Sequence, residues 1–155
     1  MFIKTIKLKK PNILAAAILV VAVAALVLII LTAWKFASPA VYEMKTETQR
    51  QEFLSEMGWE VSDEYDECKA IVIPEKFNDV YTRYNKLQKQ QGFDLSKFKG
   101  KTAEIYTYNV KNYKDHDKNG EVKANLIIYE GQLIGGDVCS TELDGFMQGL
   151  KNGTM

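Results

Sequence analysis

The sequence is poor in the residue types that most often build metal and disulfide sites. It contains one His and two Cys among 155 residues. Two cysteines exclude a disulfide-dense scaffold and a four-cysteine zinc site, and a single histidine excludes a metal site with several imidazole ligands. Few side chains remain for catalysis, so we expect no cofactor and no enzymatic activity. The length allows one domain rather than two.

Acidic residues are missing from one end of the chain. Residues 1–35 contain five lysines and no Asp or Glu, although the net charge of the whole chain is zero. Residues 36–155 carry 15 basic and 20 acidic side chains. A domain with an acidic excess is not typical of nucleic-acid binding, which needs a basic face. We therefore predict no nucleic-acid partner.

Charged residues are also absent from a long apolar run. Residues 13–33 read ILAAAILVVAVAALVLIILTA, in which Thr32 is the one mildly polar member. A helix over these 21 residues spans about 31 Å, which matches a hydrocarbon core of about 30 Å. The run therefore predicts a transmembrane helix over residues 13–34, with the lipid bilayer as its partner.

The lysines around the apolar run predict its orientation. Four lysines lie within residues 1–12, whereas Lys35 and Lys45 follow the run. The more positive side normally stays in the cytoplasm. We therefore predict a single-pass protein of the cell membrane, with a basic cytoplasmic tail over residues 1–12 and an extracellular C-terminal domain.

A cleaved secretory signal has the same general pattern as this N-terminus. Its apolar core usually covers about 7–15 residues, which is shorter than the run found here. The small-x-small site that follows, Ser38-Pro39-Ala40, has a proline at its centre. We favour the uncleaved anchor, and the sequence leaves open whether the segment is ever cleaved.

Three helices are predicted after the linker at residues 35–45. Overlapping Thr-x-x-Gln capping boxes from Thr46 open a short helix that ends at Gly58. Pro74 opens a longer helix that ends near Gly92. A third helix is expected over residues 140–150, because apolar residues recur there every three or four positions. These residues are Leu143, Phe146, Met147 and Leu150.

Runs of β-branched and aromatic residues predict the strands. Two short runs come first, at residues 59–62 and 70–73. Three longer runs follow, at residues 102–110, 121–129 and 132–138. Glu130-Gly131 is the two-residue connection of a tight hairpin between the last two.

The predicted fold is α+β, with the extracytoplasmic domain at residues 46–150 and a polar tail at residues 151–155. It consists of a small antiparallel sheet, made of a three-strand meander plus N-terminal strands, with the helices packed on one face.

Three stretches of this domain together resemble a known family. They are FLSEMGWEVS (53–62), IPEKFNDVYTRYNKLQKQQGFDLSKFKGK (73–101) and ANLIIYEGQLIGGDVCSTELDGFMQGL (124–150). They are similar to the bacterial domain-of-unknown-function family 4830, and the QGFDL and IGGDVCS motifs carry the resemblance most specifically. The resemblance implies a small membrane-anchored or exported protein of Gram-positive, Clostridium-like bacteria. It adds no catalytic residue, because the family has no assigned activity.

One polar loop has the spacing of a calcium-binding loop. Residues 115–120 read D-x-D-x-N-G, so that Asp115, Asp117 and Asn119 would supply ligand oxygens. The last ligand position needs a bidentate Glu but holds Leu126. We interpret the segment as a solvated hairpin loop and keep the three residues only as calcium candidates.

The two cysteines, Cys68 and Cys139, both follow the apolar run. A bridge between them would add roughly 4 kcal/mol of stability, but it requires Cα atoms within about 7 Å of each other. The sequence leaves this pairing open, and we favour free, buried cysteines. The resemblance implies the same, since exported Gram-positive proteins often lack disulfides. Cys139 as a nucleophile needs a base, and the sole histidine, His116, lies in the calcium-like loop.

Asp137 follows a glycine pair inside a strand pattern. A phosphate-binding loop would instead lead into a helix N-terminus, so Gly135 and Gly136 predict a bulge or the close approach of a helix. Asp137 and Asp144 have the chemistry of an acid–base pair. Asp144 also fits a capping role after Thr141, which we favour.

Two functions remain for the extracytoplasmic domain. The first is a non-enzymatic module that binds an unknown protein or envelope partner. The alternative is a small extracytoplasmic enzyme or ligand sensor that uses Asp137, Cys139 and nearby tyrosines, with Tyr106 and Tyr108 as ligand candidates. A concave pocket lined by Asp137, Cys139 and a base would favour the alternative. The partner, the physiological role and the oligomeric state are not determined by the sequence.

Overall fold

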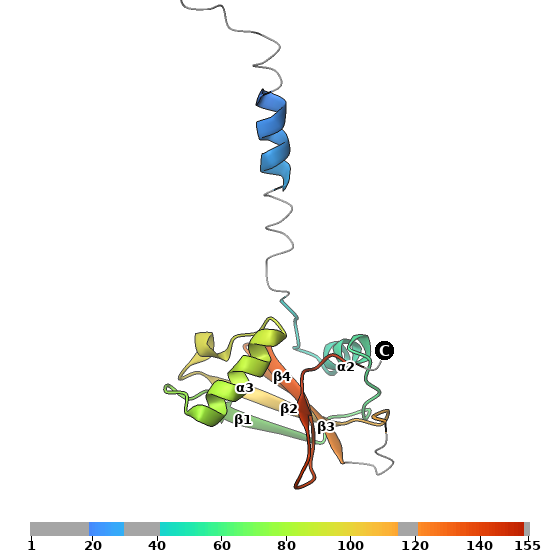
Figure 1. Cartoon of the computed structure of the whole chain (residues 1–155). Helices are drawn as coiled ribbons and strands as arrows, with labels where there is room; N and C mark the ends of the chain where they lie inside the picture. The colour runs from blue at the N-terminus through green and yellow to red at the C-terminus, as the bar shows by residue number, and fades with distance from the viewer. Residues whose placement is uncertain (1–18, 30–40, 115–120, 154–155) are drawn as a thin grey trace, which may run out of the picture. The chain divides into compact units, whose positions relative to one another are not determined.

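The computed structural model describes residues 19–29, 41–114 and 121–153. The chain divides into two compact units, residues 1–39 and residues 40–155. In the first unit, residues 19–29 form a helix with exposed side chains (Figure 1). No helix within the described ranges has the length and hydropathy of a membrane span. Half of the predicted span at residues 13–34 falls outside those ranges.

The second unit is built on a five-stranded antiparallel sheet, in which the strand order follows the sequence. The strands are β1 (Glu67–Val72), β2 (Thr102–Asn109), β3 (Val122–Tyr129), β4 (Gln132–Ser140) and β5 (Met147–Gln148). The predicted α+β class and the β2-β3-β4 meander are confirmed. Glu130 and Gly131 have φ angles of 50° and 76°, and a tight two-residue hairpin turn uses this left-handed geometry.

The two predicted N-terminal strands differ in outcome. The run at residues 70–73 is confirmed up to Val72 as part of β1, which begins earlier, at Glu67. The run at residues 59–62 forms only an isolated bridge between Val61 and Val110.

The first two predicted helices are present. Helix α2 (Glu47–Glu56) has the predicted capping box, in which the Thr46 side chain and the Gln49 side chain each accept from the other's backbone N–H. Helix α3 (Asp79–Gln90) begins later than Pro74, because the Asn78 side chain caps it by accepting from the Tyr81 N–H at 2.9 Å. A 3-10 helix, η1 (Leu95–Phe98), follows α3.

The helix predicted over residues 140–150 is wrong. The chain turns after β4 and returns as β5, in which Met147 pairs with Cys139. Leu143 lies fully exposed at the turn, so the apolar positions do not share one buried helical face. Glycines at 145 and 149 lower the helix propensity, and pairing with β4 satisfies the backbone instead.

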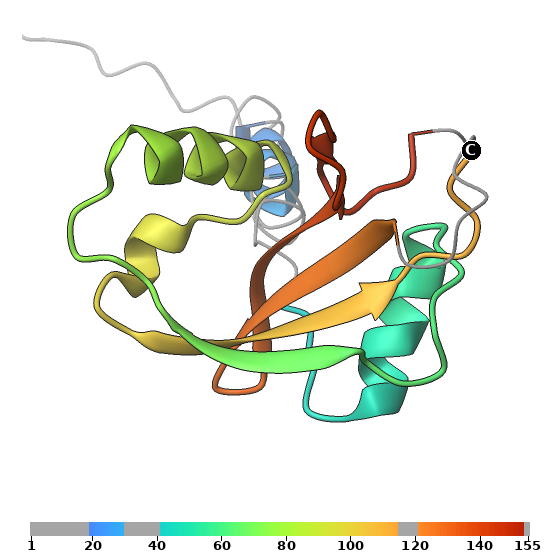
Figure 2. The ribbon, with the colours of Figure 1, turned by 90° about the horizontal axis from the view of Figure 1, so that it is seen from below.

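The helices lie on both faces of the sheet, not on one face as predicted (Figure 2). Leu126 of β3 packs in one core cluster with Leu54 of α2. Its neighbour Ile127 packs in the other cluster, against which Tyr84 of α3 is placed. Successive side chains of a strand point to opposite faces, so both faces of β3 are covered. The continuous apolar run in this strand is typical of such two-sided burial.

Candidate functional site

A groove of about 610 Å³ lies between α3 and the sheet face that this helix covers. Small-molecule sites typically have volumes of about 300–1,000 Å³. Three lining residues are charged or carry an amide, namely Arg83, Asn125 and Asp137. Most of the remaining lining is apolar and includes Ile71, Val80, Leu87, Ile105, Ile127 and Met147.

Helix α3 forms one wall because its sequence repeats at helical spacing. Val80, Arg83, Tyr84 and Leu87 recur at intervals of three or four residues and line the groove together. Val80 is 62 % exposed and Arg83 is also exposed, so this wall is open to solvent. The groove is therefore accessible from outside the domain.

A row of hydrogen bonds crosses the floor of the groove. Thr107, Asn125 and Asp137 lie opposite one another on β2, β3 and β4, which places their side chains on one face. The Thr107 hydroxyl donates to Asn125 Oδ1 at 2.9 Å, and Asn125 Nδ2 donates to Asp137 Oδ2 at 3.0 Å. From α3, the Tyr84 hydroxyl donates to Asp137 Oδ1 at 2.7 Å.

Burial controls the protonation of this row. Asp137 is 3 % exposed, and burial raises its pKa although hydrogen bonds from Tyr84 and Asn125 act in the opposite direction. Burial, followed by the negative charge of Asp137, raises the pKa of the Cys139 thiol to about 11. The thiol is therefore protonated at neutral pH and is not a ready nucleophile.

The two cysteines are both free, as predicted. Cys139 is half-buried and lies beside the row, 3.5 Å from Asn125 Nδ2. Cys68 is exposed, so its predicted burial is wrong. It lies on β1, which is three strands from β4 in the sheet order, and strands spaced by about 4.8 Å put the two residues beyond bridging distance.

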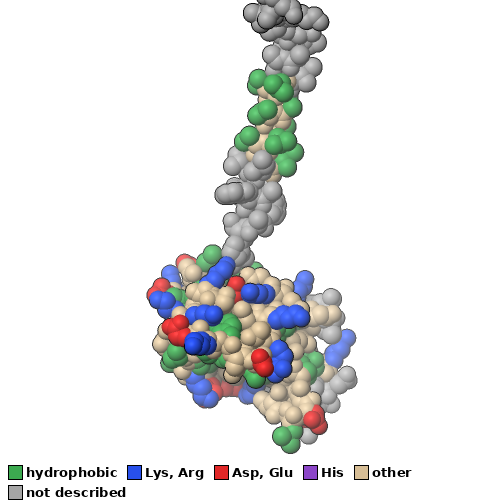
Figure 3. All heavy atoms as spheres, turned by 60° about the vertical axis from the view of Figure 1, so that its left-hand side comes forward, with side chains coloured by type: hydrophobic (Ala, Val, Ile, Leu, Met, Phe, Trp, Pro, Cys, Tyr) green, Lys and Arg blue, Asp and Glu red, His purple; other side chains and the backbone are tan. Residues whose placement is uncertain are grey.

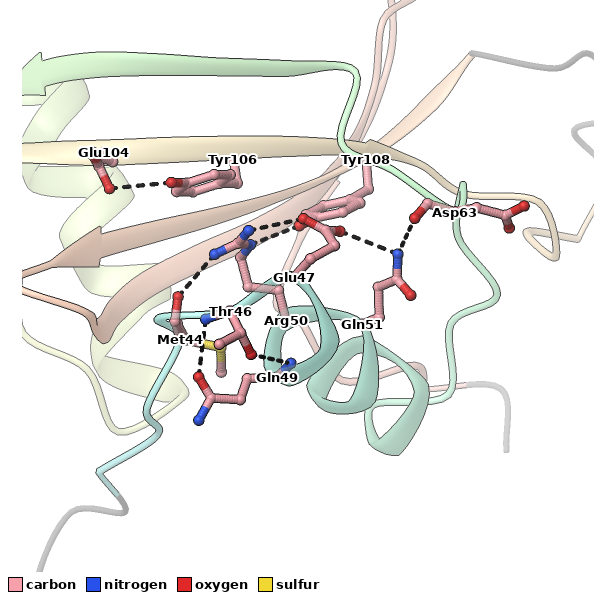
Figure 4. A network of polar contacts seen from close by, with 10 residues as sticks. All are labelled: Met44, Thr46, Glu47, Gln49, Arg50, Gln51, Asp63, Glu104, Tyr106 and Tyr108. Atoms are coloured by element: carbon pink, nitrogen blue, oxygen red, sulfur yellow. Dashed lines mark hydrogen bonds and ion pairs between the residues drawn. The ribbon is translucent and has the colours of Figure 1, made fainter.

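Tyr106 and Tyr108 lie on the opposite face of the sheet from the groove and belong to the packing of α2 (Figure 4). Arg50 of α2 is 6 % exposed, and its Nε donates to the Tyr108 hydroxyl at 2.9 Å. Its other nitrogens donate to the Met44 carbonyl at 3.0 Å and to the Glu47 carboxylate at 2.8 Å. The guanidinium lies 4.0 Å from the Tyr106 ring centroid. These contacts fix α2 on the sheet.

The other predicted acidic residues do not join the groove. Asp144 is exposed between β4 and β5, and the helix that it was expected to cap is not formed there. The calcium candidates Asp115, Asp117 and Asn119, and His116 with them, lie outside the described residues. Within the described ranges, no group of three or more His, Cys, Asp or Glu side chains could hold a metal ion.

The glycine pair of β4 lies beside an irregularity of the sheet and takes the close approach of a helix. The β3–β4 register shifts between Ile127 and Ile128, which leaves Ile134, next to the pair, without a partner on β3. Gln88 of α3 is fully buried against the pair, donating to the Gly136 carbonyl at 2.9 Å and accepting from the Gly136 N–H at 2.8 Å. A Cβ on Gly135 would lie 2.9 Å from Gln88 Oε1, so glycine at this position permits the close docking of α3.

Sequence reasoning missed Asn125 and Arg83 as site residues. Asn125 had a visible signal, because it is an amide inside an otherwise apolar β-run. Arg83 had no such signal, because exposed arginines are common on helices. The tyrosine that contacts Asp137 is Tyr84, whereas the sequence favoured Tyr106 and Tyr108.

A family model described as "Domain of unknown function (DUF4830)" matches residues 53–138, which is more than half of the chain. The match confirms the resemblance found in the sequence, and it includes Tyr84, Asn125 and Asp137 of the groove. Neither the comparison with curated proteins nor the comparison with solved structures gave a match.

Proposed function

We propose that this chain, which belongs to the DUF4830 family, is a non-enzymatic, membrane-tethered module that holds an anionic amphiphile in the groove between α3 and the sheet. The observation that carries this proposal is the composition of the groove, in which a cation, Arg83, joins an otherwise mostly apolar wall. An apolar chain with an anionic head is the ligand class that complements this lining.

The apolar part of the ligand is matched to the floor and walls. Ile105 and Ile127 of the sheet face Val80 and Leu87 of α3 across the groove. Each methylene buried there contributes about 0.8 kcal/mol. A medium-length acyl chain therefore gains enough from burial to offset the cost of its immobilisation.

The anionic head is matched to Arg83. This side chain is exposed, and it makes no ion pair within the described part of the chain. A guanidinium presents a rigid fork of donors that fits a carboxylate or a phosphate. The buried acid Asp137 would repel an anionic head at the floor, so the head lies at Arg83 and the chain lies over the floor.

The tether follows from the apolar run at residues 13–33 and the lysines before it. In this arrangement the domain lies outside the cytoplasm, beside a membrane that supplies amphiphiles. The ligand is thus an envelope component.

One observation favours the enzyme alternative. Tyr84 is hydrogen-bonded directly to Asp137, and Asn125 contacts both Asp137 and Cys139. The raised pKa of Cys139, about 11, weighs against it because the thiolate is scarce at neutral pH. Each oxygen of Asp137 already accepts a hydrogen bond from a neighbouring side chain. This arrangement favours a structural floor over a reacting group.

The test is calorimetric titration of the full-length chain, held in zwitterionic nanodiscs, with dodecanoate, dodecyl phosphate and dodecanol. Empty nanodiscs provide the blank. We expect saturable binding of at least one of the two anions. Arg83→Gln should weaken it about tenfold or more, because a hydrogen-bonded charge is lost. Lys86→Gln, which removes a charge from the same helix outside the groove, should leave the affinity unchanged.

Binding no stronger than that of empty nanodiscs would contradict the proposal. Equal affinity for dodecanol and the anions, unchanged by Arg83→Gln, would contradict the assigned role of Arg83. A difference between carboxylate and phosphate would identify the head group.

A further inference from the structure

Positive charge is concentrated in one segment of the domain. Residues 73–101 carry seven Lys or Arg and three Asp or Glu. The rest of residues 36–155 carries eight Lys or Arg and seventeen Asp or Glu. The segment includes α3 and η1, and all seven of its basic residues are exposed. We name this surface the basic face, formed by Lys76, Arg83, Lys86, Lys89, Lys97, Lys99 and Lys101. Figure 3 shows Lys and Arg side chains spread over the side of the molecule turned forward there.

The acidic residues of the segment leave most of this charge uncompensated. Lys89 Nζ lies 3.6 Å from Asp94, and this pair neutralises one lysine. Glu75 and Asp79 are the other two acids and are exposed. Lys99 lies 5.0 Å from the Phe77 ring centroid, so the face also combines a lysine with an aromatic ring. Basic and aromatic side chains together are typical of a lipid interface.

We propose that the basic face binds the anionic phospholipid headgroups of the bilayer in which residues 13–33 are anchored. This inference rests on the tether of the proposed function. Residues 34–39 separate the apolar run from the domain, and an extended chain from residue 33 to residue 40 covers at most about 25 Å. The tether therefore limits how far the domain can move from the bilayer, whose anionic surface attracts basic residues over about a Debye length.

The distribution of charge also favours one orientation of the domain. The part of residues 36–155 that lies outside residues 73–101 carries an acidic excess of nine, so an anionic surface repels the rest of the domain while it attracts α3 and η1. A bilayer is the anionic partner that the tether keeps at high local concentration. We therefore assign this surface to lipid rather than to a soluble polyanion.

The test measures protection of lysines in the full-length chain. The chain is placed in nanodiscs of phosphatidylcholine, with or without phosphatidylglycerol, and Lys76 and Lys89 are followed by amine acetylation and mass spectrometry. The test variant changes Lys86, Lys97, Lys99 and Lys101 to Gln. The control variant changes Lys45, Lys69, Lys111 and Lys151 to Gln, which removes as many charges from exposed positions elsewhere. Both variants keep Arg83.

We expect phosphatidylglycerol to slow acetylation of Lys76 and Lys89 severalfold, since each basic residue at an anionic surface contributes about fivefold to binding. The protection should be lost in the test variant and kept in the control variant. Raising the salt from about 0.1 M to about 1 M, which shortens the Debye length to roughly 3 Å, should also remove it.

Equal acetylation with and without phosphatidylglycerol, in a chain that remains in the nanodiscs, would overturn this inference and leave the tether intact. Protection by added heparin but not by phosphatidylglycerol would also overturn it. A chain that does not enter nanodiscs would contradict the tether itself. Sedimentation of that chain with phosphatidylglycerol vesicles then decides the inference. Binding that is lost in the test variant would support it, and absence of binding would overturn it.

Discussion

The Tyr84 hydroxyl donates a 2.7 Å hydrogen bond to Asp137 Oδ1 and thereby joins α3 to β4. The two residues are 53 positions apart in the sequence. The bond closes one end of a polar row that continues through Asn125 to Thr107. It therefore ties the wall of the groove to its floor, and the shape of the groove depends on it.

Removing the Tyr84 hydroxyl should destabilise the domain. Tyr84→Phe leaves the buried Asp137 without one of its donors, and we expect a loss of about 1–3 kcal/mol in the free energy of unfolding. It should also raise the pKa of Asp137 further, because a lowering hydrogen bond is lost. Urea denaturation of the full-length chain measures the first effect. Tyr81→Phe is the control, and an equal loss in both variants would contradict the importance of this bond.

A methyl group on Gly136 should overpack the contact of β4 with β3 and with Leu150 of the core. The added Cβ would lie 2.5 Å from the Asn125 carbonyl oxygen and 2.8 Å from Leu150 Cδ1. We expect Gly136→Ala to cost about 1–3 kcal/mol through overpacking. At Gly153 a Cβ meets nothing within 4 Å, so Gly153→Ala should stay within about 0.5 kcal/mol. Thermal denaturation compares the two variants, and similar melting temperatures would argue against tight packing around Gly136.

Replacing Arg50 should weaken the packing of α2 on the sheet. Arg50→Gln removes the charge that binds Glu47 and Tyr108, and we expect a loss of about 2–3 kcal/mol. Lys45→Gln breaks a pair in which both side chains are about 60 % exposed, and should cost at most about 1 kcal/mol. Chemical denaturation of both variants measures the two losses in the free energy of unfolding. A small effect of Arg50→Gln would show that apolar packing alone holds α2.

Asp94 should contribute a pH-dependent part of the stability. Burial alone would raise its pKa, but hydrogen bonds from Ser96 and Asn85 outweigh that effect and lower the pKa to about 2, from 3.8. The Asp94 carboxylate therefore binds a proton more tightly in the unfolded chain than in the folded chain. The contribution is complete above pH 3.8 and is lost as the pH falls through about 2.

The matching experiment follows the free energy of unfolding between neutral pH and about pH 2. The stability difference between the natural chain and Asp94→Asn should be constant at neutral pH and shrink over that acid window. Glu142→Gln, at an exposed turn position, serves as the reference. A difference that does not change with pH would contradict the assigned pKa.

Local signals predicted the parts of the fold that depend on neighbouring residues. The capping box at Thr46 and the Glu130-Gly131 hairpin are decided within a few positions, and both were confirmed. The helix predicted over residues 140–150 was wrong because the apolar spacing fits a helix. The segment instead pairs with β4, where Met147 lies opposite Cys139, and no local pattern reveals this pairing. The prediction that the helices pack on one face of the sheet failed for the same reason.

The groove was predicted only in part. Asp137 was a candidate in the sequence, because it follows a glycine pair and has the chemistry of an acid or base. Its partners Tyr84 and Asn125 come from α3 and β3, and only the tertiary fold brings the three together. Tyr106 and Tyr108 resembled ligand residues by type, yet α2 covers their face through Arg50.

Methyl NMR of the full-length chain in zwitterionic nanodiscs tests the binding groove most directly. Dodecanoate should shift the resonances of Ile105 and Ile127, which line the groove, in a saturable manner. Ile128, the next residue on β3, lies in the core cluster on the opposite face and should keep its resonance. Unmoved Ile105 and Ile127, or an equal shift of Ile128, would contradict binding in this groove.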